Sequence, residues 1–427
     1  MIDFLKSEPV LIVLRLVIYL VAIIAFVALN AAYLVLAERK GAGWFQRRPG
    51  PVEAGPWGLL QPIADGLKLI AKQTIVPPGT DGLLFRMAPA LVLAPALMCL
   101  VTIPYGDTVI ARNINVGLLM VFSFGSINVF AIMLGGWASR NKFAVISAAR
   151  IVSQNVAYEI PMLLVVITMM MITGTLDLQQ IVGQQAGGFW QWNIFRGIWD
   201  IHAGHLGSNI LMPVTFLIFF ICMLAETNRA PFDMAEAESE LTAGFHTEYS
   251  GLRWSLFMLA EYAAMIAVSS IAVTLWLGGW MRPFPNFLNA PAWGFFFSLF
   301  PGLTFAGLAA IAFIGTARMP SDSFFKIQRA GLAIFALLLA FLALVLFVVA
   351  IVGRNPDHRL LASFREGIDY VFWFVLKVAV FMYMFIWYRA TWPRYRFDQL
   401  MRVGWKVLLP ISLGVLILTA IVGVLVP

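Results

Sequence analysis

Charged side chains are scarce in this chain, and their scarcity excludes a soluble fold. Asp, Glu, Lys and Arg make up 12% of the 427 residues, hydrophobic residues make up 61%, and the mean hydropathy is +0.86. Apolar runs of about 17 residues or more recur along the chain, which is typical of helices that cross a bilayer. The sequence therefore predicts an all-α integral membrane protein, with the lipid bilayer and no nucleic acid among its partners.

Cysteine and histidine are also few, which argues against a metal or redox centre. Cys99 and Cys222 stand alone in apolar segments, and the four histidines have no spacing with cysteine that would hold zinc, haem or an iron-sulfur cluster. His202 and His205 lie close together in a loop, where such a pair is usually polar surface. We expect this chain to bind no cofactor.

Ten apolar segments are predicted to span the membrane, within a single membrane domain of residues 1–427. They are residues 10–37, 83–104, 115–136, 143–172, 209–225, 254–277, 294–316, 330–352, 370–388 and 407–426. The run from residue 209 is the shortest. The first run lacks a cleavage site and is too long for a signal-peptide core, so we expect it to be retained.

The distribution of Lys and Arg predicts the orientation of the chain. The odd-numbered loops carry 18 of these residues, whereas the even-numbered loops and the chain ends carry seven. By the positive-inside rule the odd-numbered loops face the cytoplasm, or the matrix of an organelle, and both termini lie on the opposite side. The cytoplasmic side then carries a long first loop, residues 38–82, and an acidic loop, residues 226–253.

The first loop contains an amphipathic segment, residues 57–72, that predicts a helix. Gln61, Asp65, Lys68 and Lys72 share one helical stripe, and apolar residues such as Leu67 make up the other. Such a helix lies in the membrane interface or packs on the bundle as a surface helix. Periodicity does not separate these two interpretations.

Negative charge is concentrated in and just after the acidic loop. Seven of the 22 acidic residues fall between positions 226 and 261, namely Glu226, Asp233, Glu236, Glu238, Glu240, Glu248 and Glu261. A solvated loop that contacts a basic partner is one interpretation. Because Pro231, Phe232 and Phe245 are available for burial, we favour an ordered segment that lines a cavity with carboxylates on its walls, where mutual repulsion makes protons easy to take up.

Ionisable residues inside predicted spans are the second candidate set. Each costs about 2.5 to 3.5 kcal/mol at mid-helix on insertion scales, so its presence calls for a partner or a task. Glu159, in a polar stripe with Gln154, Asn155 and Tyr158, and Glu261 are candidates for a proton relay. The alternative is that each is a permanent partner of Arg150 or Lys377. Spacing leaves both interpretations open.

Four blocks of sequence carry a family resemblance. They are Ala37–Leu69, Asn155–Pro161, Glu226–Gly251 and Arg389–Pro410, which together occupy about a fifth of the chain. In these blocks the chain resembles the quinone-site membrane subunit of proton-translocating NADH:quinone oxidoreductase, or complex I, which is designated H in bacteria and 1 in mitochondria. The resemblance implies a translocase subunit that forms the quinone entry passage and links quinone reduction to proton translocation.

The resemblance also implies roles for particular residues. The first and sixth spans and the interfacial helix would frame the quinone entrance. The quinone passage would be lined by Glu38, Arg39, Asp65, Arg229 and Asp233; an acidic funnel would be formed by Glu236, Glu238, Glu240 and Glu248; a proton path would continue through Glu226, Glu261 and Glu159.

The partners implied by the resemblance lie outside this chain. They are peripheral-arm subunits with flavin and iron-sulfur clusters, antiporter-like and small membrane subunits, and quinone as the substrate. The implied location is the bacterial inner membrane. Ubiquinone and menaquinone are not distinguished.

The chain departs from the family pattern in two places. Gln73 and Thr74 stand where the family commonly has an acidic pair, which puts a role for those positions in doubt. Ten spans are predicted where the family usually has eight, and residues 294–352 are the expected additional hairpin. The alternative functions are a related subunit of a membrane-bound hydrogenase or of a ferredoxin or deazaflavin dehydrogenase, a secondary transporter, and a purely structural anchor.

Overall fold

All the regular secondary structure in the described part of the chain is helical. The computed structural model describes residues 8–195, 211–234, 243–284, 291–318, 323–354 and 359–425, and within them it contains helices and no strands. This confirms the predicted all-α class. The acidic residues Glu236, Glu238 and Glu240 and the histidines His202 and His205 lie outside the described residues.

Nine segments of the described chain are long and apolar enough to cross a membrane. The helices that provide them are α2 (Glu8–Phe45), α4 (Gly82–Thr102), α5 (Gly117–Ala138), α6 (Lys142–Thr173), α12 (Gly251–Trp276), α14 (Phe300–Arg318), α15 (Ser323–Val352), α16 (Arg359–Thr391) and the continuous run of α17 (Phe397–Val403), η5 (Gly404–Leu408) and α18 (Leu409–Leu425). The tenth predicted span is α10 (Met212–Glu226), an apolar helix of 15 residues. A helix of this length rises about 22 Å, which is shorter than the hydrocarbon core.

Shorter elements connect these helices. They are η1 (Pro56–Gly58), α3 (Gln61–Ala71), α7 (Leu178–Gly183), η2 (Phe189–Gln191), η3 (Gly244–His246) and α13 (Pro291–Ser298). The predicted amphipathic helix of residues 57–72 is thus split between η1 and α3. The split occurs because Trp57 has a φ of 53°, outside the helical range, and the glycines on either side of the Pro56–Trp57 pair also have positive φ.

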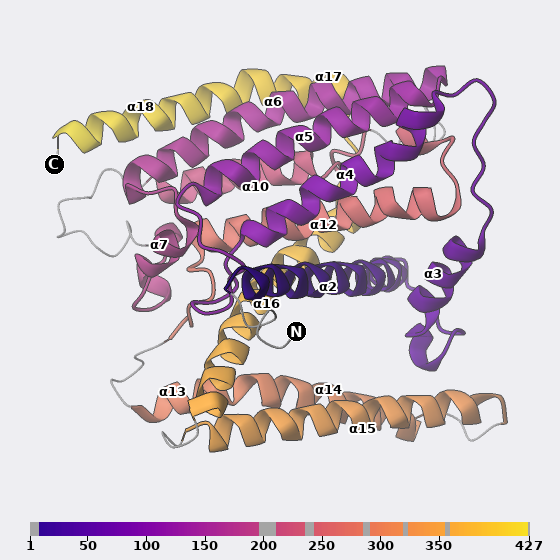
Figure 1. Ribbon diagram of the computed structural model, residues 1–427, viewed down its shortest axis with the longest axis vertical. Helices are drawn as coiled ribbons and strands as arrows, with labels where there is room; N and C mark the ends of the chain where they lie inside the picture. The colour runs from indigo at the N-terminus through magenta and orange to yellow at the C-terminus, as the bar shows by residue number, and fades with distance from the viewer. Residues whose placement is uncertain are drawn as a thin grey trace.

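The helices form one large bundle, one oblique helix and one separate hairpin. In Figure 1, α4, α5, α6, α10, α12 and α18 lie side by side, α2 runs along their flank, and α16 crosses obliquely toward the α14–α15 hairpin. The main core is apolar and contains fully buried side chains such as Tyr158, Phe219 and Trp276. Trp276 satisfies its indole N–H by donating to Thr215 Oγ1 at 3.1 Å.

Helix α16 begins earlier than the sequence predicted. Charged residues before position 370 indicated a loop, but the helix starts at Arg359. Asp369 is buried there and accepts hydrogen bonds from Arg282 Nε at 2.6 Å and from Trp373 Nε1 at 3.2 Å. Because the carboxylate is paired within the protein, the charge does not interrupt the helix.

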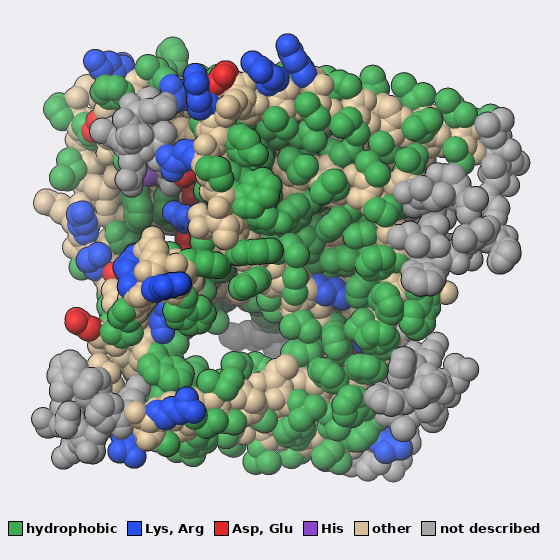
Figure 2. Space-filling model, turned by 180° about the vertical axis from the view of Figure 1, so that it is seen from behind, with side chains coloured by type: hydrophobic (Ala, Val, Ile, Leu, Met, Phe, Trp, Pro, Cys, Tyr) green, Lys and Arg blue, Asp and Glu red, His purple; other side chains and the backbone are tan. Residues whose placement is uncertain are grey.

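Basic side chains gather at the end of the molecule that carries α3. Figure 2 shows Lys and Arg there, whereas the middle of the surface is a broad band of hydrophobic side chains. Arg39, Arg47, Arg48 and Lys68 are exposed at this end. We call it the predicted cytoplasmic face, because the same residues set the predicted orientation.

Candidate functional site

Three elements converge on Glu38, near the end of α2. Arg389 of α16 places Nη1 2.9 Å from Glu38 Oε2, and Arg229 of the acidic loop places Nη1 3.4 Å from Glu38 Oε1. The hydroxyl of Tyr262, on α12, donates to Glu38 Oε2 at 3.0 Å. One carboxylate therefore joins helices α2, α12 and α16 and the acidic loop at the predicted cytoplasmic face.

Arg229 is the central cation of this site, and only 8% of its surface is exposed. Its Nη2 lies 3.5 Å from Glu261 Oε2, and its guanidinium lies 4.5 Å from the centre of the Tyr262 ring. A buried cation held by two carboxylates and an aromatic face is well compensated. Of the sequence alternatives for Glu261, the structure therefore shows an ion pair, but with Arg229 rather than with Arg150 or Lys377.

The acidic loop contributes a second ion pair beside the first. Asp233 is buried, and it accepts a hydrogen bond from Arg394 Nη2 at 2.9 Å. Phe232, the residue before it, stacks on Tyr395 with ring centres 5.5 Å apart and also contacts Tyr158. The segment that follows α16 therefore clamps this part of the loop through both a charge and an aromatic ring.

Gln154 of α6 fixes the start of the loop from the opposite side. Its Nε2 donates to the carbonyl oxygens of Ala225 at 2.8 Å and Phe232 at 2.9 Å, and to Asn228 Oδ1 at 3.2 Å. The amide is fully buried, so these bonds are formed away from water. The polar stripe of α6 thus holds the backbone of the loop that carries Arg229.

Asp65 of α3 lies at the exposed edge of the site. It pairs with Arg39 of α2 at 2.9 Å and with Lys68 at 3.3 Å, and Gln61 donates to it. Partial burial raises the pKa of Asp65, but the hydrogen bonds from Lys68 and Gln61 and the charge of Arg39 outweigh it, so the pKa lies below its ordinary value. Leu60, Ile63, Leu67 and Ile70 are each more than half exposed, which supports a position of α3 in the membrane interface.

Glu159 and Glu226 occupy a different environment, deeper in the bundle. Glu159 of α6 accepts a hydrogen bond from the hydroxyl of Ser126 on α5. Glu226, the last residue of α10, lies close enough to Glu159 to interact with it electrostatically, and its buried Oε2 accepts no hydrogen bond within the described residues. Neither carboxylate forms a salt bridge with any residue that the structure describes.

A small cavity adjoins Glu226. It has a volume of about 40 Å³ and is lined by residues of α4, α5 and α12 together with Glu226 and Thr227. Asn128 Oδ1, also on its wall, is buried and accepts no hydrogen bond within the described residues. A cavity of this size with two polar atoms that need partners is suited to an ordered water molecule.

The acidic funnel is only partly described. Glu248 accepts a hydrogen bond from Asn141 Nδ2 at 2.7 Å and borders an open surface groove that also contains Arg140 and Lys142. Its position near these basic residues is compatible with both sequence interpretations of the loop. The three acids between residues 235 and 242 lie outside the described residues.

The acidic loop also contains a buried histidine. His246 is 5% exposed and its ring packs against Phe245 and Trp254. Burial disfavours the charged imidazolium and lowers the pKa of His246 to about 4. The imidazole is therefore neutral at physiological pH.

Within the described residues, neither Lys377 nor Arg150 forms a salt bridge with Glu159 or Glu261. Lys377 Nζ donates to the carbonyl oxygens of Leu277, Gly279 and Met281 at 2.7 to 2.8 Å and lies 4.1 Å from the centre of the Trp192 ring. It stabilises the chain just after α12, where helical carbonyls lack partners. The guanidinium of Arg150 lies over the ring of Phe397.

Several residues of the site were not singled out by the sequence. Arg389 and Arg394 were counted only as positive charges on loops, and Ser126 and Asn128 are uncharged residues within an apolar run. The family resemblance in the block Arg389–Pro410 could have pointed to these two arginines. Nothing local distinguishes Ser126, because its importance arises from its contact with Glu159 on another helix.

The described residues offer no obvious ligands for a metal ion or a redox centre. No group of three or more His, Cys, Asp or Glu side chains with metal-binding geometry occurs there. Cys99 and Cys222 are free thiols buried in the core.

Comparison with known proteins places the chain in a family. The NADH dehydrogenase family matches residues 18–420, and the chain therefore belongs to it. Curated relatives, each named as the NADH-quinone oxidoreductase subunit designated H, come from Koribacter versatilis, 49% identical over 95% of this chain and 91% of that protein, and from Desulfotalea psychrophila, 42% identical over 93% of each. A relative of the same designation from Solibacter usitatus is 39% identical over 94% of this chain and 95% of its own length.

Proposed function

We propose that this chain is the membrane subunit of NADH:quinone oxidoreductase that forms the quinone passage and links quinone reduction to proton translocation. The observation that carries the proposal is the convergence of Arg229, Tyr262 and Arg389 on Glu38, beside the interfacial helix α3. The names of the relatives support the quinone enzyme over the hydrogenase and dehydrogenase alternatives and over a secondary transporter.

The passage would enter between α2, α12 and α3. Asp65 and Arg39 lie at its exposed edge, while Glu38 and Arg229 lie further inside, with Asp233 beside them. The apolar stripe of α3 would contact the hydrophobic tail of the quinone in the membrane interface, and the arginines would supply donors to the carbonyl oxygens of its headgroup.

The reduction of quinone would affect the site through the negative charge that it places on the quinone headgroup. Quinone becomes quinol by taking up two electrons and two protons, so electrons that arrive first leave negative charge on the headgroup. In a site of low dielectric, that charge competes with Glu38 and Glu261 for Arg229. The carboxylate released from its arginine then takes up a proton more readily.

Protons would continue through the deeper carboxylates. Glu226 and Glu159 interact electrostatically and lack cationic partners in the described residues, and Glu226 adjoins a cavity with room for water. Glu236, Glu238, Glu240 and Glu248 would collect protons at the acidic funnel. Flavin and iron-sulfur clusters on peripheral subunits would deliver the electrons, and antiporter-like subunits in a bacterial inner membrane would use the proton displacement.

The test of the passage is a separation of two NADH oxidation activities. In the purified complex, Glu38→Gln is expected to raise the KM for quinone by about tenfold, because Arg229 and Arg389 lose their shared partner. Oxidation of NADH by a water-soluble artificial acceptor, which bypasses the quinone site, stays at the wild-type rate. Glu366→Gln, an exposed acid on α16, is the matched control. Unchanged quinone kinetics in Glu38→Gln would contradict the proposal.

A further inference from the structure

The α14–α15 hairpin contacts the rest of the described chain mainly at its two ends. At one end both helices meet the first half of α16, and at the other end α15 meets η1 of the first loop. Figure 2 shows an opening between the hairpin and the bundle in the region between these contacts. The hairpin is therefore attached to the rest of the described chain at both ends, and the residues at each end indicate which part of the molecule the hairpin supports.

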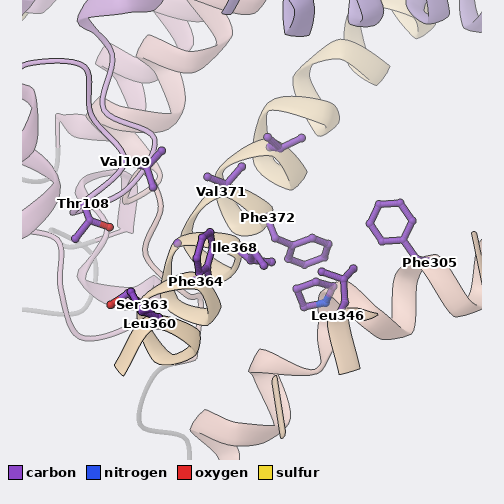
Figure 3. A pocket seen from close by; sticks show the side chains of 13 residues that line it. Thr108, Val109, Phe305, Leu346, Leu360, Ser363, Phe364, Ile368, Val371 and Phe372 are labelled. Carbon is purple, nitrogen blue, oxygen red and sulfur yellow. The ribbon is translucent and has the colours of Figure 1, made fainter. Parts of the chain in front are cut away.

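The end near α16 is apolar and loosely filled. A groove of about 610 Å³ lies there, with Phe305, Leu346 and Phe372 on its walls, and Figure 3 shows these side chains around an open space. Nothing in the structure selects an occupant for this groove. This end therefore does not explain why the hairpin is present.

The end near η1 is tightly fitted. The side chain of Trp57 packs on a cluster formed by Ala312 of α14 and by Leu332 and Ala336 of α15. Its ring lies so close to Gly315 that a Cβ at that position would come within 2.2 Å of it. Gly331 makes similar room for Pro56, whose Cδ would lie 3.3 Å from a Cβ there. Small residues on both helices thus form a socket for the Pro56–Trp57 pair.

The backbone of this pair is held from a second side. Lys40, near the end of α2, donates its ammonium to the carbonyl oxygen of Trp57. Gly58 N–H donates to Gly55 O at 3.1 Å, and Leu60 N–H donates to Ala54 O at 3.1 Å, which closes the turn. Trp57 itself has a φ of 53°, a conformation that bulky residues rarely adopt and that persists where surrounding contacts fix it.

Helix α3 begins three residues after Gly58. Its far end is anchored separately, because Ile75 N–H donates to Ser250 Oγ at 3.1 Å, next to the start of α12. None of the α3 side chains is buried. Besides these ends, α3 contacts α2 and α12, and its Asp65 pairs with Arg39 of α2, so the turn at Trp57 is one of a small set of contacts that position the helix.

We infer that Trp57, seated in the socket of the α14–α15 hairpin, is a positioning residue that fixes the start of α3 and thereby the mouth of the quinone passage. The part of this inference that concerns quinone rests on the proposed function. The part that concerns the position of α3 does not.

The experiment uses hydrogen–deuterium exchange in the intact complex, followed by quinone kinetics. Gly315→Val places methyl groups where the Trp57 ring lies, and Gly307→Val, on the same helix with nothing within 4 Å of the added Cβ, is the matched control. Trp57→Ala empties the socket, and Trp57→Phe retains an aromatic ring and is expected to restore most of the wild-type behaviour.

Two results are expected. Amide exchange across residues 53–72 rises about tenfold in Gly315→Val and Trp57→Ala but not in Gly307→Val or Trp57→Phe, because the loop loses its anchor. In the same two variants the KM for a long-tailed quinone rises by about threefold or more, while kcat and oxidation of NADH by a water-soluble acceptor stay within about twofold.

The outcomes separate this inference from the proposed function. Unchanged exchange in both Gly315→Val and Trp57→Ala overturns the inference. Raised exchange with unchanged quinone KM, when Glu38→Gln does raise the KM, overturns the role at the passage mouth. Raised exchange with no effect of either Glu38→Gln or Gly315→Val on quinone supports the anchoring of α3 and overturns the proposed function instead.

Discussion

Two groups of carboxylates, one at the predicted cytoplasmic face and one deeper in the bundle, differ in what surrounds them. Glu38, Glu261 and Asp233 each face an arginine, and Arg229 serves two of them. Glu159 and Glu226 interact electrostatically with each other; Glu159 accepts a hydrogen bond from a serine hydroxyl, Glu226 borders a small cavity, and neither forms a salt bridge with the described residues. The first group consists of charges held in place by partners. The second has the composition of a site whose charge changes.

The two groups of carboxylates also differ in how they affect the stability of the protein. A carboxylate that is paired inside a protein stabilises the fold only while its partner remains, because removing one member leaves the other charge buried alone. A carboxylate without a cationic partner costs stability while it is charged, and that cost is tolerated where the group has a task. The same substitution, Glu to Gln, should therefore have opposite effects on stability in the two groups.

The largest effect is expected from Arg229→Met. This substitution removes the cation shared by Glu38 and Glu261 and leaves both carboxylates with one partner fewer in a region of low exposure. We expect a loss of roughly 3 to 5 kcal/mol of stability, measured as a lower thermal midpoint and weaker retention of the subunit in the purified complex. Arg229→Lys keeps the charge and should recover part of the loss. A thermal midpoint equal to wild type in Arg229→Met would show that the pairs contribute little.

Glu38→Gln and Glu226→Gln are expected to differ in their effect on stability. Glu38→Gln is expected to lower stability by roughly 2 to 4 kcal/mol, because it leaves Arg229 and Arg389 without their shared carboxylate. Glu226→Gln is expected to be neutral or mildly stabilising, since it removes repulsion from Glu159. Thermal midpoints of the two complexes, measured side by side, test the difference in sign. Equal losses in both variants would remove the distinction between the two groups.

A smaller effect concerns the buried base of the acidic loop. The pKa of His246 is lowered by burial from an ordinary 6.5 to about 4. The unfolded chain therefore binds a proton between these values and the folded chain does not, so stability present above pH 6.5 falls as the pH drops toward 4. At pH 5 the loss is roughly 2 kcal/mol. His246→Phe should lack this part of the pH dependence of the thermal midpoint, and identical pH profiles would contradict it.

The sequence predicted the broad architecture well because hydropathy and length determine which segments span a bilayer. Each of the ten predicted spans corresponds to a helix in the part of the chain that the structure describes, and the weakest of them, from residue 209, contains the short helix α10. A predicted helix boundary was wrong where a charged residue is paired with a residue distant in the sequence. Asp369 looked like part of a loop, yet its partner Arg282 lies in a separate segment of the chain.

The candidate site was predictable only in part for a similar reason. The acidic loop and the buried glutamates Glu261 and Glu159 stand out in an apolar sequence and were proposed as functional for that reason, whereas Glu38 and Arg229 were proposed only through the family resemblance. Their pairing was not accessible, because Arg229 and Glu38 are 191 residues apart in the chain. Ser126 and the socket for Trp57 consist of small or common residues whose roles exist only once the helices are packed.

Proton translocation by Glu226→Gln and Glu159→Gln, reconstituted with the intact complex in liposomes, is the most direct test of the account. The ratio of protons moved to NADH oxidised is measured with quinone as the acceptor, with Glu366→Gln as the exposed control. We expect that ratio to fall by about tenfold in both variants while oxidation of NADH by a water-soluble acceptor is unchanged, because the passage of protons needs a group that binds and releases them. A wild-type ratio in both variants would contradict the claim that this pair carries protons.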